Sequence, residues 1–190
     1  MLDDAQDYDA VAALLLHPPK LWTRAEVLVR PTPVPAEPGI YGWHFTTAPS
    51  PELDAGRLLY VGIAPKHMSN RTSKTHLRQR VRYHFNGNAE GSTLRLTLGC
   101  LLGLQLRRVG SGKRMTFGPH GEKQLNDWMQ DNARVCWQPC PEPWIVESAV
   151  IGKTDLPLNL DQNRDHPFRA RLATLRRQAK QRARELPILT

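Results

Sequence analysis

The sequence predicts an α+β (α/β) fold in which a small, mainly antiparallel sheet of three strands is flanked by helices. The first observation is a set of three short runs rich in aromatic and β-branched residues, at 39–45, 57–63 and 134–138. The second is that helical patterns fill most of the sequence around these runs. The third is size, because 190 residues, of which 40% are hydrophobic, suffice for one domain with an ordinary core.

The first two strands are expected to form a hairpin with a long loop, because a polar segment rich in Pro, Ser and Gly separates them. Ahead of them, residues 3–17 are expected to form a short helix that ends at Pro18 and Pro19. Thr23 is a candidate cap for a second short helix. The Pro-rich segment 31–38 should then run extended and lead the chain into the first strand.

Further helices are expected at 77–85, 92–104, 122–133, 142–152 and 168–185. Ser92 is the N-cap candidate of the second of these helices, and Pro143 suits the first turn of the fourth. Residues 114–117 could add a short edge strand. The segment VGSGKR at 109–114 lacks the pattern of a phosphate-binding loop, since Arg107 stands where a glycine is needed. We therefore interpret it as a hairpin turn.

The formal net charge of +8 favours an acidic partner, of which nucleic acid is the usual one. Much of this charge lies in the last predicted helix, which carries seven basic residues and a single acidic one, Glu185. The basic residues are Arg169, Arg171, Arg176, Arg177, Lys180, Arg182 and Arg184. This helix is either a solvated face or an arm that follows the phosphates of a nucleic acid, and the sequence leaves both interpretations open.

Cysteine usage and the N-terminal sequence bear on the compartment. The three cysteines, Cys100, Cys136 and Cys140, are an odd number and do not form a disulfide framework, which favours a reducing cytoplasm. The acidic start does not suit a secretory signal. The best apolar run there, residues 10–16, falls far short of the about 20 residues that a membrane span needs. We expect a cytoplasmic protein with no membrane partner.

Five short elements follow one another through the middle of the chain. They are GIY at 39–41, YVG at 60–62, RVRYH at 80–84, Glu147 within a predicted helix, and Asn159 within PLN. Their order resembles that of the GIY-YIG nuclease superfamily, which is named for the first two elements. The resemblance implies an endonuclease-like fold of the kind predicted above.

With this resemblance the chain divides into three parts. Residues 1–38 form an N-terminal helix and Pro-rich lead-in, residues 39–163 a nuclease domain, and residues 164–190 a basic C-terminal helix. About 103–130 looks longer than a minimal domain of this family requires and is a candidate insertion. The stretch between Tyr41 and Tyr60 is also longer than the family's usual hairpin loop.

The residues of the first two elements are compatible with a shared site. Tyr41 and Tyr60 can stand on the same side of two neighbouring strands, because alternate side chains of a strand share a face. Gly39 and Gly62 would let backbone or substrate approach closely. Tyrosines in a sheet are also common as ordinary core residues, so the pair has a purely structural interpretation as well.

The other elements supply charge. Arg80 and His84 are four residues apart and so share one helix face, and Arg80 offers a planar fork of donors suited to a phosphate. Glu147 lies in an otherwise apolar run, where a buried carboxylate is costly without a partner or a metal. It could hold Mg²⁺ or Mn²⁺ alone if water and phosphate oxygens fill the remaining positions.

The resemblance implies a role for each residue in phosphodiester hydrolysis. Tyr41 would be the general base that takes a proton from water, and Tyr60 would hydrogen-bond the scissile phosphate or the water. Arg80 would neutralise charge on the phosphoryl oxygens. Glu147 would bind Mg²⁺ or Mn²⁺, which stabilises the leaving 3′ oxygen. Asn159 would brace the site by hydrogen bonds, although it could also be a simple turn residue.

A tyrosine with a pKa near 10 is a poor base at neutral pH. The proton of Tyr41 must therefore be relayed, or its pKa lowered by nearby cations, and His84 or Lys66 could do this. Lys66, Arg78 and Arg82 are expected to bind the substrate, although the arginines of this helix could equally form a solvated surface.

The sequence therefore predicts a metal-dependent endonuclease acting on nucleic acid, most simply DNA, as a monomer or as a homodimer that cuts both strands. The alternative is a catalytically weak nucleic-acid-binding module that retains the GIY-YIG fold. A basic protein–protein scaffold that binds no nucleic acid is a third hypothesis. The motifs do not indicate which form of nucleic acid is cut.

Overall fold

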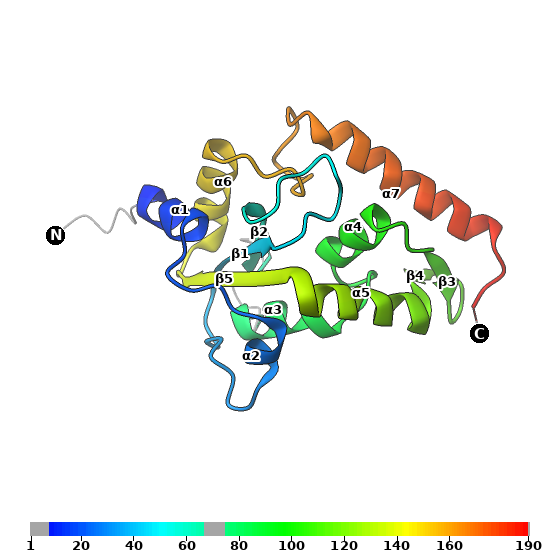
Figure 1. Ribbon diagram of the computed structural model, residues 1–190, viewed down its shortest axis with the longest axis horizontal. Coiled ribbons are helices and arrows are strands. Elements are labelled where there is room, and N and C mark those ends of the chain that lie inside the picture. The colour runs from blue at the N-terminus through cyan, green and yellow to red at the C-terminus, as the bar shows by residue number, and fades with distance from the viewer. Residues whose placement is uncertain (1–7, 67–74, 190) are drawn as a thin grey trace.

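A three-stranded antiparallel sheet lies between two groups of helices in the computed structural model, which describes residues 8–66 and 75–189 (Figure 1). The strand order is β2 (Leu58–Ala64), β1 (Gly39–Phe45), β5 (Ala133–Pro139), so β1 is central. All seven residues of β1 are buried. The predicted α+β class and its three strands are confirmed, each strand to within one residue at either end.

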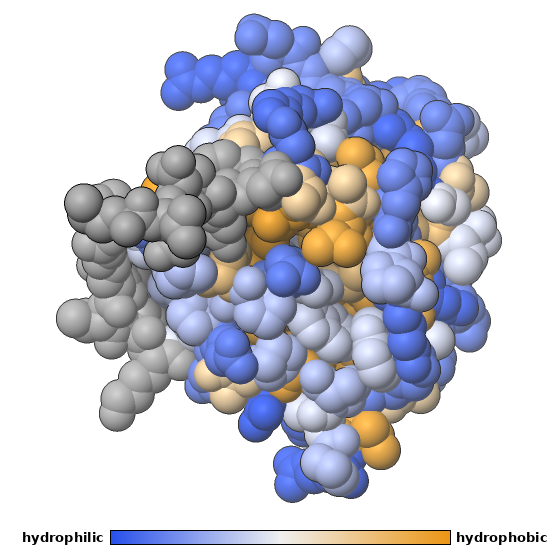
Figure 2. Space-filling view, turned by 90° about the vertical axis from the view of Figure 1, so that its left-hand side faces the viewer, coloured by the Kyte–Doolittle hydropathy of each residue, from blue (hydrophilic) through white to orange (hydrophobic). Residues whose placement is uncertain are grey.

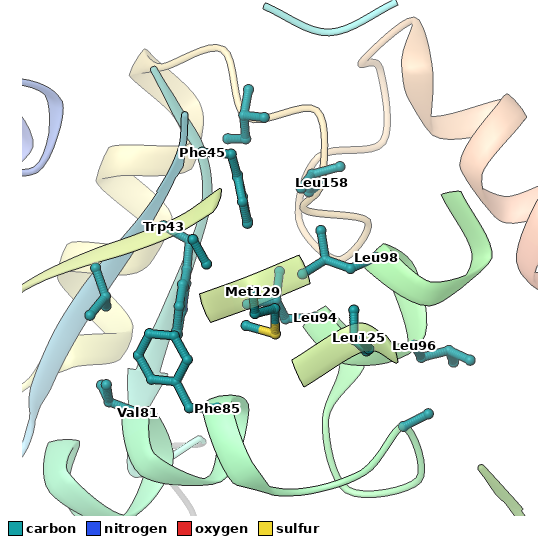
Figure 3. Packing of buried hydrophobic residues seen from close by; sticks show 14 of the residues in the cluster. Trp43, Phe45, Val81, Phe85, Leu94, Leu96, Leu98, Leu125, Met129 and Leu158 are labelled. Carbon is teal, nitrogen blue, oxygen red and sulfur yellow. The ribbon is translucent and has the colours of Figure 1, made fainter. Parts of the chain in front are cut away.

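The alternation of side chains along β1 divides the core in two. Ile40 faces a cluster built with α1 (Tyr8–Leu16) and α6 (Pro143–Lys153). Trp43 and Phe45 face a larger cluster built with α3 (Leu77–Asn86), α4 (Thr93–Leu101) and α5 (Gly118–Asn132). Figure 3 shows this second cluster, in which the rings of Trp43 and Phe85 meet edge to face at 4.8 Å. Helices therefore cover both faces of the sheet.

The outer surface on the side of α1 is mostly hydrophilic, with some hydrophobic side chains gathered near its middle (Figure 2). Leu14 and Leu16 of α1 and Ile145 of α6 are among the exposed large hydrophobic residues. Within the described residues, no helix combines the length and the apolar character needed to cross a membrane. Cys100, Cys136 and Cys140 are all buried and none of them forms a disulfide, as the sequence predicts.

Short segments close the two edges of the sheet. Trp22 forms a β-bridge with Val135 at the outer edge of β5, and its ring stacks on Trp137 with centroids 5.3 Å apart. It is followed by α2 (Arg24–Leu28), which Thr23 caps in a capping box with Glu26, as the sequence predicts for Thr23. On the opposite edge, the amide of Leu158 donates to the carbonyl of Leu59 in β2.

A hairpin and a long helix complete the fold. Strands β3 (Arg107–Val109) and β4 (Arg114–Thr116) pair around a turn at 110–113, which confirms the interpretation of VGSGKR as a hairpin turn. The predicted last helix is α7 (Phe168–Glu185), which packs on α4 and β3 (Figure 1).

The other predicted helices differ from the structure mainly at their ends. The described part of the first begins at Tyr8, and residues 3–7 lie outside the described residues. The helix from Ser92 ends at Leu101 rather than 104, because Gly103 takes a positive φ of 72° that breaks the helical path. The predicted 122–133 helix starts earlier, at Gly118, with Pro119 in its first turn. The domain boundaries given above stay predictions.

One buried charge holds the three helices of the larger cluster together. Arg95 of α4 is fully buried, and its Nη2 lies 2.6 Å from Oε2 of Glu122 in α5. Its Nη1 donates to the carbonyl oxygens of His84 and Phe85 at 3.1 and 3.2 Å, in the last turn of α3. These carbonyls would otherwise lack partners at the end of the helix. Arg95 thereby fixes α3 and α5 against α4.

We predict that Glu122→Gln lowers the free energy of unfolding by about 3 kcal/mol or more, because it leaves the Arg95 guanidinium buried without its counter-charge. The measurement is urea denaturation followed by circular dichroism. Asp127→Asn is the matched control, since Asp127 pairs with Lys123 on the exposed side of the same helix. Its expected cost is below about 1 kcal/mol. Equal effects of the two substitutions would contradict this role of Arg95.

Candidate active site

A cleft of about 280 Å³ lies where β1, β2, α3 and α6 meet the loop that follows α6. Seven of the residues singled out from the sequence line it. They are Tyr41, Tyr60, Gly62, Lys66, Arg80, Glu147 and Asn159. The structure thus brings together side chains that are more than 100 positions apart in the sequence.

A chain of two hydrogen bonds runs from Tyr41 into the core. Tyr41 Oη lies 2.8 Å from Nε2 of His84, and Nδ1 of the same imidazole lies 2.7 Å from Oγ of Ser92. All three side chains are buried. Burial lowers the pKa of His84 well below its usual value, and the charges of Arg80 and Arg95 lower it further, so the imidazole is neutral. A neutral imidazole can accept a proton.

The position of Tyr41 depends on a glycine in the neighbouring strand. Tyr41 pairs with Gly62 across β1 and β2, and a Cβ placed on Gly62 would lie 2.5 Å from the hydroxyl oxygen of Tyr41. Glycine is therefore required at this point for close approach rather than for a special backbone angle. Tyr60 pairs with Trp43 and faces the same side of the sheet as Tyr41, diagonally across the strand pair.

Gly39 has a related geometry at the other end of β1. A Cβ added there would lie 2.5 Å from the carbonyl oxygen of Gln138 and 2.7 Å from Cδ1 of Leu77. Leu77 is the first residue of α3, so the missing side chain lets the start of α3 approach the sheet closely. This approach sets the position from which α3 projects Arg80 and His84.

Arg80 brings a positive charge to the cleft beside the Tyr41 hydroxyl. Burial raises the pKa of Tyr41, whereas the charge of Arg80 and its hydrogen bond to the phenol lower it. The Nε of Arg80 is buried and has no hydrogen-bond partner among the described residues. A buried donor without a partner is costly, which favours an anionic ligand at this guanidinium. Burial also raises the pKa of Tyr60, which therefore keeps its proton.

Glu147 projects from α6 into the same cleft. Burial raises the pKa of its carboxyl to about 7, and the negative charge of Asp161 contributes in the same direction. A hydrogen bond of 3.2 Å from Gln162 Nε2 and the charge of Lys66 oppose this shift. A carboxylate whose ionised form is this disfavoured gains from a cation.

The donor set of the cleft fits a hard divalent ion that keeps most of its water. No group of three or more His, Cys, Asp or Glu side chains in the described parts of the chain could enclose a metal. Glu147 would be the main protein ligand, and water and substrate oxygens would fill the other positions, which suits Mg²⁺ better than zinc. The oxygens of Ser148 and Asp161 line the same cleft.

Asn159 fixes the loop after α6 to the edge of β2. Its Oδ1 accepts from the amide of Val61 and its Nδ2 donates to the carbonyl of Val61, both at 2.9 Å. The side chain thus pairs with the backbone of β2 as a neighbouring strand would. This geometry places Asp161 and Gln162 of the same loop opposite Glu147.

Two of the residues expected to bind the substrate do not line the cleft. Arg78 and Arg82 lie on a different side of α3 from Arg80 and His84, and both are exposed. Nε of Arg78 donates to the carbonyl of Val34 at 2.9 Å, so Arg78 anchors the Pro-rich segment. Lys66, by contrast, lies at the rim of the cleft.

The sequence did not point to Ser92 or Gln162 as part of this site. Ser92 is the N-cap of α4, as predicted, and its Oγ accepts from the amide of Arg95 at 3.1 Å. Its second contact, with His84, depends on how α3 and α4 pack, and no local pattern signals it. Gln162 has a positive φ of 62°, which its sequence does not predict either.

Comparison with known proteins identifies the family. A family model described as the GIY-YIG catalytic domain matches residues 43–178. The chain belongs to this family. The match begins within β1, just after the GIY element, and ends within α7. No curated protein and no solved structure matches the chain.

Membership of the GIY-YIG family indicates an endonuclease whose substrate is nucleic acid. Nucleases of this family generally use divalent metals. The resemblance found in the sequence is thereby confirmed, together with the three-stranded antiparallel fold. The family match assigns no role to any single residue, and the catalytic roles of individual residues stay predictions.

We predict that Gly62→Ala lowers nucleic-acid cleavage by this GIY-YIG domain about 100-fold, because the added methyl group would displace the Tyr41 hydroxyl from His84. The rate is measured under single-turnover conditions. Gly152→Ala is the matched control, since nothing lies within 4 Å of a Cβ at Gly152. The control should cleave at the wild-type rate. A Gly62→Ala variant as fast as the control would show that the position of Tyr41 is unimportant.

Proposed function

We propose that the protein is a divalent-metal-dependent endonuclease that hydrolyses phosphodiester bonds in DNA at the cleft described above. The observation that carries this proposal is the 2.8 Å contact between Tyr41 Oη and a neutral, buried His84, beside the guanidinium of Arg80. A phenol, an acceptor for its proton and a fixed cation are what the attack of water on a phosphate requires.

Tyr41 acts as the general base through a relay. As water attacks phosphorus, its proton passes to Tyr41 Oη, and the phenolic proton passes to Nε2 of His84. The bond from phosphorus to the leaving 3′ oxygen breaks in the same displacement. The relay requires the tautomer of His84 in which Nδ1–H donates to Ser92 Oγ. The same hydrogen bond to Ser92 stabilises the imidazolium once Nε2 has taken the proton. No free tyrosinate has to form, so the raised pKa of Tyr41 is no obstacle.

Arg80 and Tyr60 bind the phosphate. The Nε–H of Arg80 has no partner among the described residues, so this donor can bind the scissile phosphate, and the charge of the guanidinium neutralises the charge that develops on the phosphoryl oxygens. Tyr60 keeps its proton because burial raises its pKa, and it therefore donates a hydrogen bond to a phosphoryl oxygen or to the attacking water. Lys66 adds positive charge at the rim of the cleft.

Glu147 holds the metal, Mg²⁺ or Mn²⁺. A divalent ion bound there supplies positive charge for the leaving 3′ oxygen. Gln162 orients the carboxylate through its hydrogen bond, and Asn159 holds the loop that carries Gln162. Without metal, the pKa of the Glu147 carboxyl is about 7. Protons therefore compete with the metal ion for this carboxylate near neutral pH.

Cytoplasmic location and a homodimer that would cut both strands stay predictions. The preference for DNA over RNA is part of the proposal. The RNA substrates in the test below check it.

We predict that the wild-type protein cleaves nucleic acid in Mg²⁺ or Mn²⁺ and that EDTA abolishes the cleavage. Arg80→Ala should lower the rate about 10²–10³-fold, because one preorganised donor to the developing charge is lost. Glu147→Gln should lower it at least as far and weaken its dependence on metal concentration. The measurement uses single-stranded, duplex, flapped and four-way DNA, with matching RNA.

Glu185→Gln is the control for removal of one carboxylate, since Glu185 is exposed at the end of α7. It should leave the rate unchanged. The proposal fails if no nucleic acid is cut, or if cleavage survives in both Arg80→Ala and Glu147→Gln. Metal-independent binding without turnover would instead support a nucleic-acid-binding module that has lost catalysis.

A further inference from the structure

One arginine of α7 faces the interior of the protein. Leu172 and Ala183 are fully buried, and they define the side of α7 that packs on the rest of the fold. Arg176 lies four residues after Leu172 and so shares its face, with Ala179 three residues further on. Arg176 is half-buried, whereas the next residue, Arg177, is exposed. An arginine in an apolar packing stripe calls for an explanation.

Arg176 has no hydrogen bond or ion pair with any described residue. Two other arginines that are partly or fully buried, Arg95 and Arg108, do have such partners. Arg95 pairs with Glu122, and Arg108 donates to the carbonyl oxygens of Ala183 and Leu186. Burial lowers the pKa of Arg176, which reflects the cost of placing this charge there. An arginine nevertheless stays charged, so it gains from an anion.

The surroundings of Arg176 connect it to the proposed active site. The ionisable groups that interact with it are Cys100 at the end of α4, Asp161 and Tyr60. Asp161 and Tyr60 both line the cleft that holds Tyr41 and Arg80. In Figure 1, α7 leaves the loop after α6 and runs beside α4.

Further basic residues follow Arg176 along α7, at increasing distance from the cleft. Lys180 follows Arg176 by four residues, is also half-buried, and interacts with Cys100. With Arg184 and Lys113 it lines a second, smaller hollow between α7 and the β3–β4 hairpin. A nucleic-acid strand that extends from the cleft along α7 would meet these cations in order, beginning with Arg176.

We propose that Arg176 binds a phosphate of the substrate strand outside the cleavage position, and that α7 thereby sets the register of the strand in the cleft. This inference rests on the proposed nuclease function. Arg176 is a substrate-binding residue rather than a catalytic one, because the phosphate it holds is not the one that is cut.

The test compares Arg176→Met with Arg177→Met, each in the slowly cleaving Glu147→Gln background. Methionine keeps the packing of the arginine stem and removes the charge. Arg177 is the matched control, because its charge lies on the exposed side of the same helix and donates only to Thr174 Oγ1. Binding of a fluorescent 20-nucleotide DNA, single-stranded and duplex, is measured by anisotropy in Mg²⁺ at several salt concentrations.

We expect Arg176→Met to weaken binding about 10-fold and to lower the salt slope of log K by about one unit. Arg177→Met should change the affinity less than about 2-fold. Arg176→Gln is measured beside it, so that the comparison does not depend on one variant. The melting temperature of Arg176→Met should equal or exceed that of the parent, because an unpaired, half-buried charge is removed.

Each outcome bears on one proposal or both. Equal affinities for the Arg176 and Arg177 variants would overturn this inference and leave the nuclease proposal standing. Weaker binding accompanied by an unchanged salt slope and a large fall in melting temperature would assign Arg176 a structural role instead. A parent protein that binds neither form of DNA would overturn both this inference and the proposed function.

Discussion

The hydrogen bond between Tyr41 Oη and His84 Nε2 joins the sheet to α3, and the geometry of the cleft depends on it. Tyr41 comes from the central strand and His84 from the helix packed over it, so the bond exists only if both lie in their observed places. Gly62 provides the space for the phenol, and Gly39 lets α3 approach the strand. The two glycines therefore determine the distance between the hydroxyl of Tyr41 and the imidazole of His84.

The same bond places a polar chain in an otherwise apolar cluster, where each polar group needs a partner. Ser92 meets this need for His84 at the N-terminus of α4. Arg95, one turn further along α4, binds the last carbonyls of α3 and is neutralised by Glu122 of α5. The helix packing that stabilises the core thus also holds the proposed proton relay. A substitution in α5 can in this way disturb chemistry on the other side of α3.

Much of the fold and part of the site could be predicted from the sequence. The three strands are short runs with strong β propensity between helical segments, and such runs are visible locally. Tyr41 and Tyr60 could be placed on one face from strand alternation, and Arg80 and His84 from helical spacing. The order of the motifs connected them to Glu147 and Asn159. Each of these features depends on residues that are close together in the sequence or on motifs that follow one another in a fixed order.

Contacts between distant helices could not be predicted in this way. The contact of Ser92 with His84 and that of Arg95 with Glu122 depend on the angles at which α3, α4 and α5 pack, which no local spacing encodes. For the same reason, the sequence left open whether Arg78 and Arg82 bind the substrate or form a solvated surface, and only the packing of α3 shows that they lie away from the cleft. The inward position of Arg176 became visible only once α7 was seen on α4.

The most direct test of the central claim is the pH dependence of single-turnover cleavage by wild type and by His84→Gln at saturating Mg²⁺. The pKa of His84 lies well below 6.5, so the imidazole is neutral and can accept the proton of Tyr41 throughout the range from pH 6 to 9. The wild-type rate should therefore be nearly independent of pH there. His84→Gln should be slower at pH 7 by about 10²-fold or more, and its rate should rise about tenfold per pH unit, because the base must now ionise before it acts. A His84→Gln variant with the wild-type rate and the wild-type profile would contradict the relay.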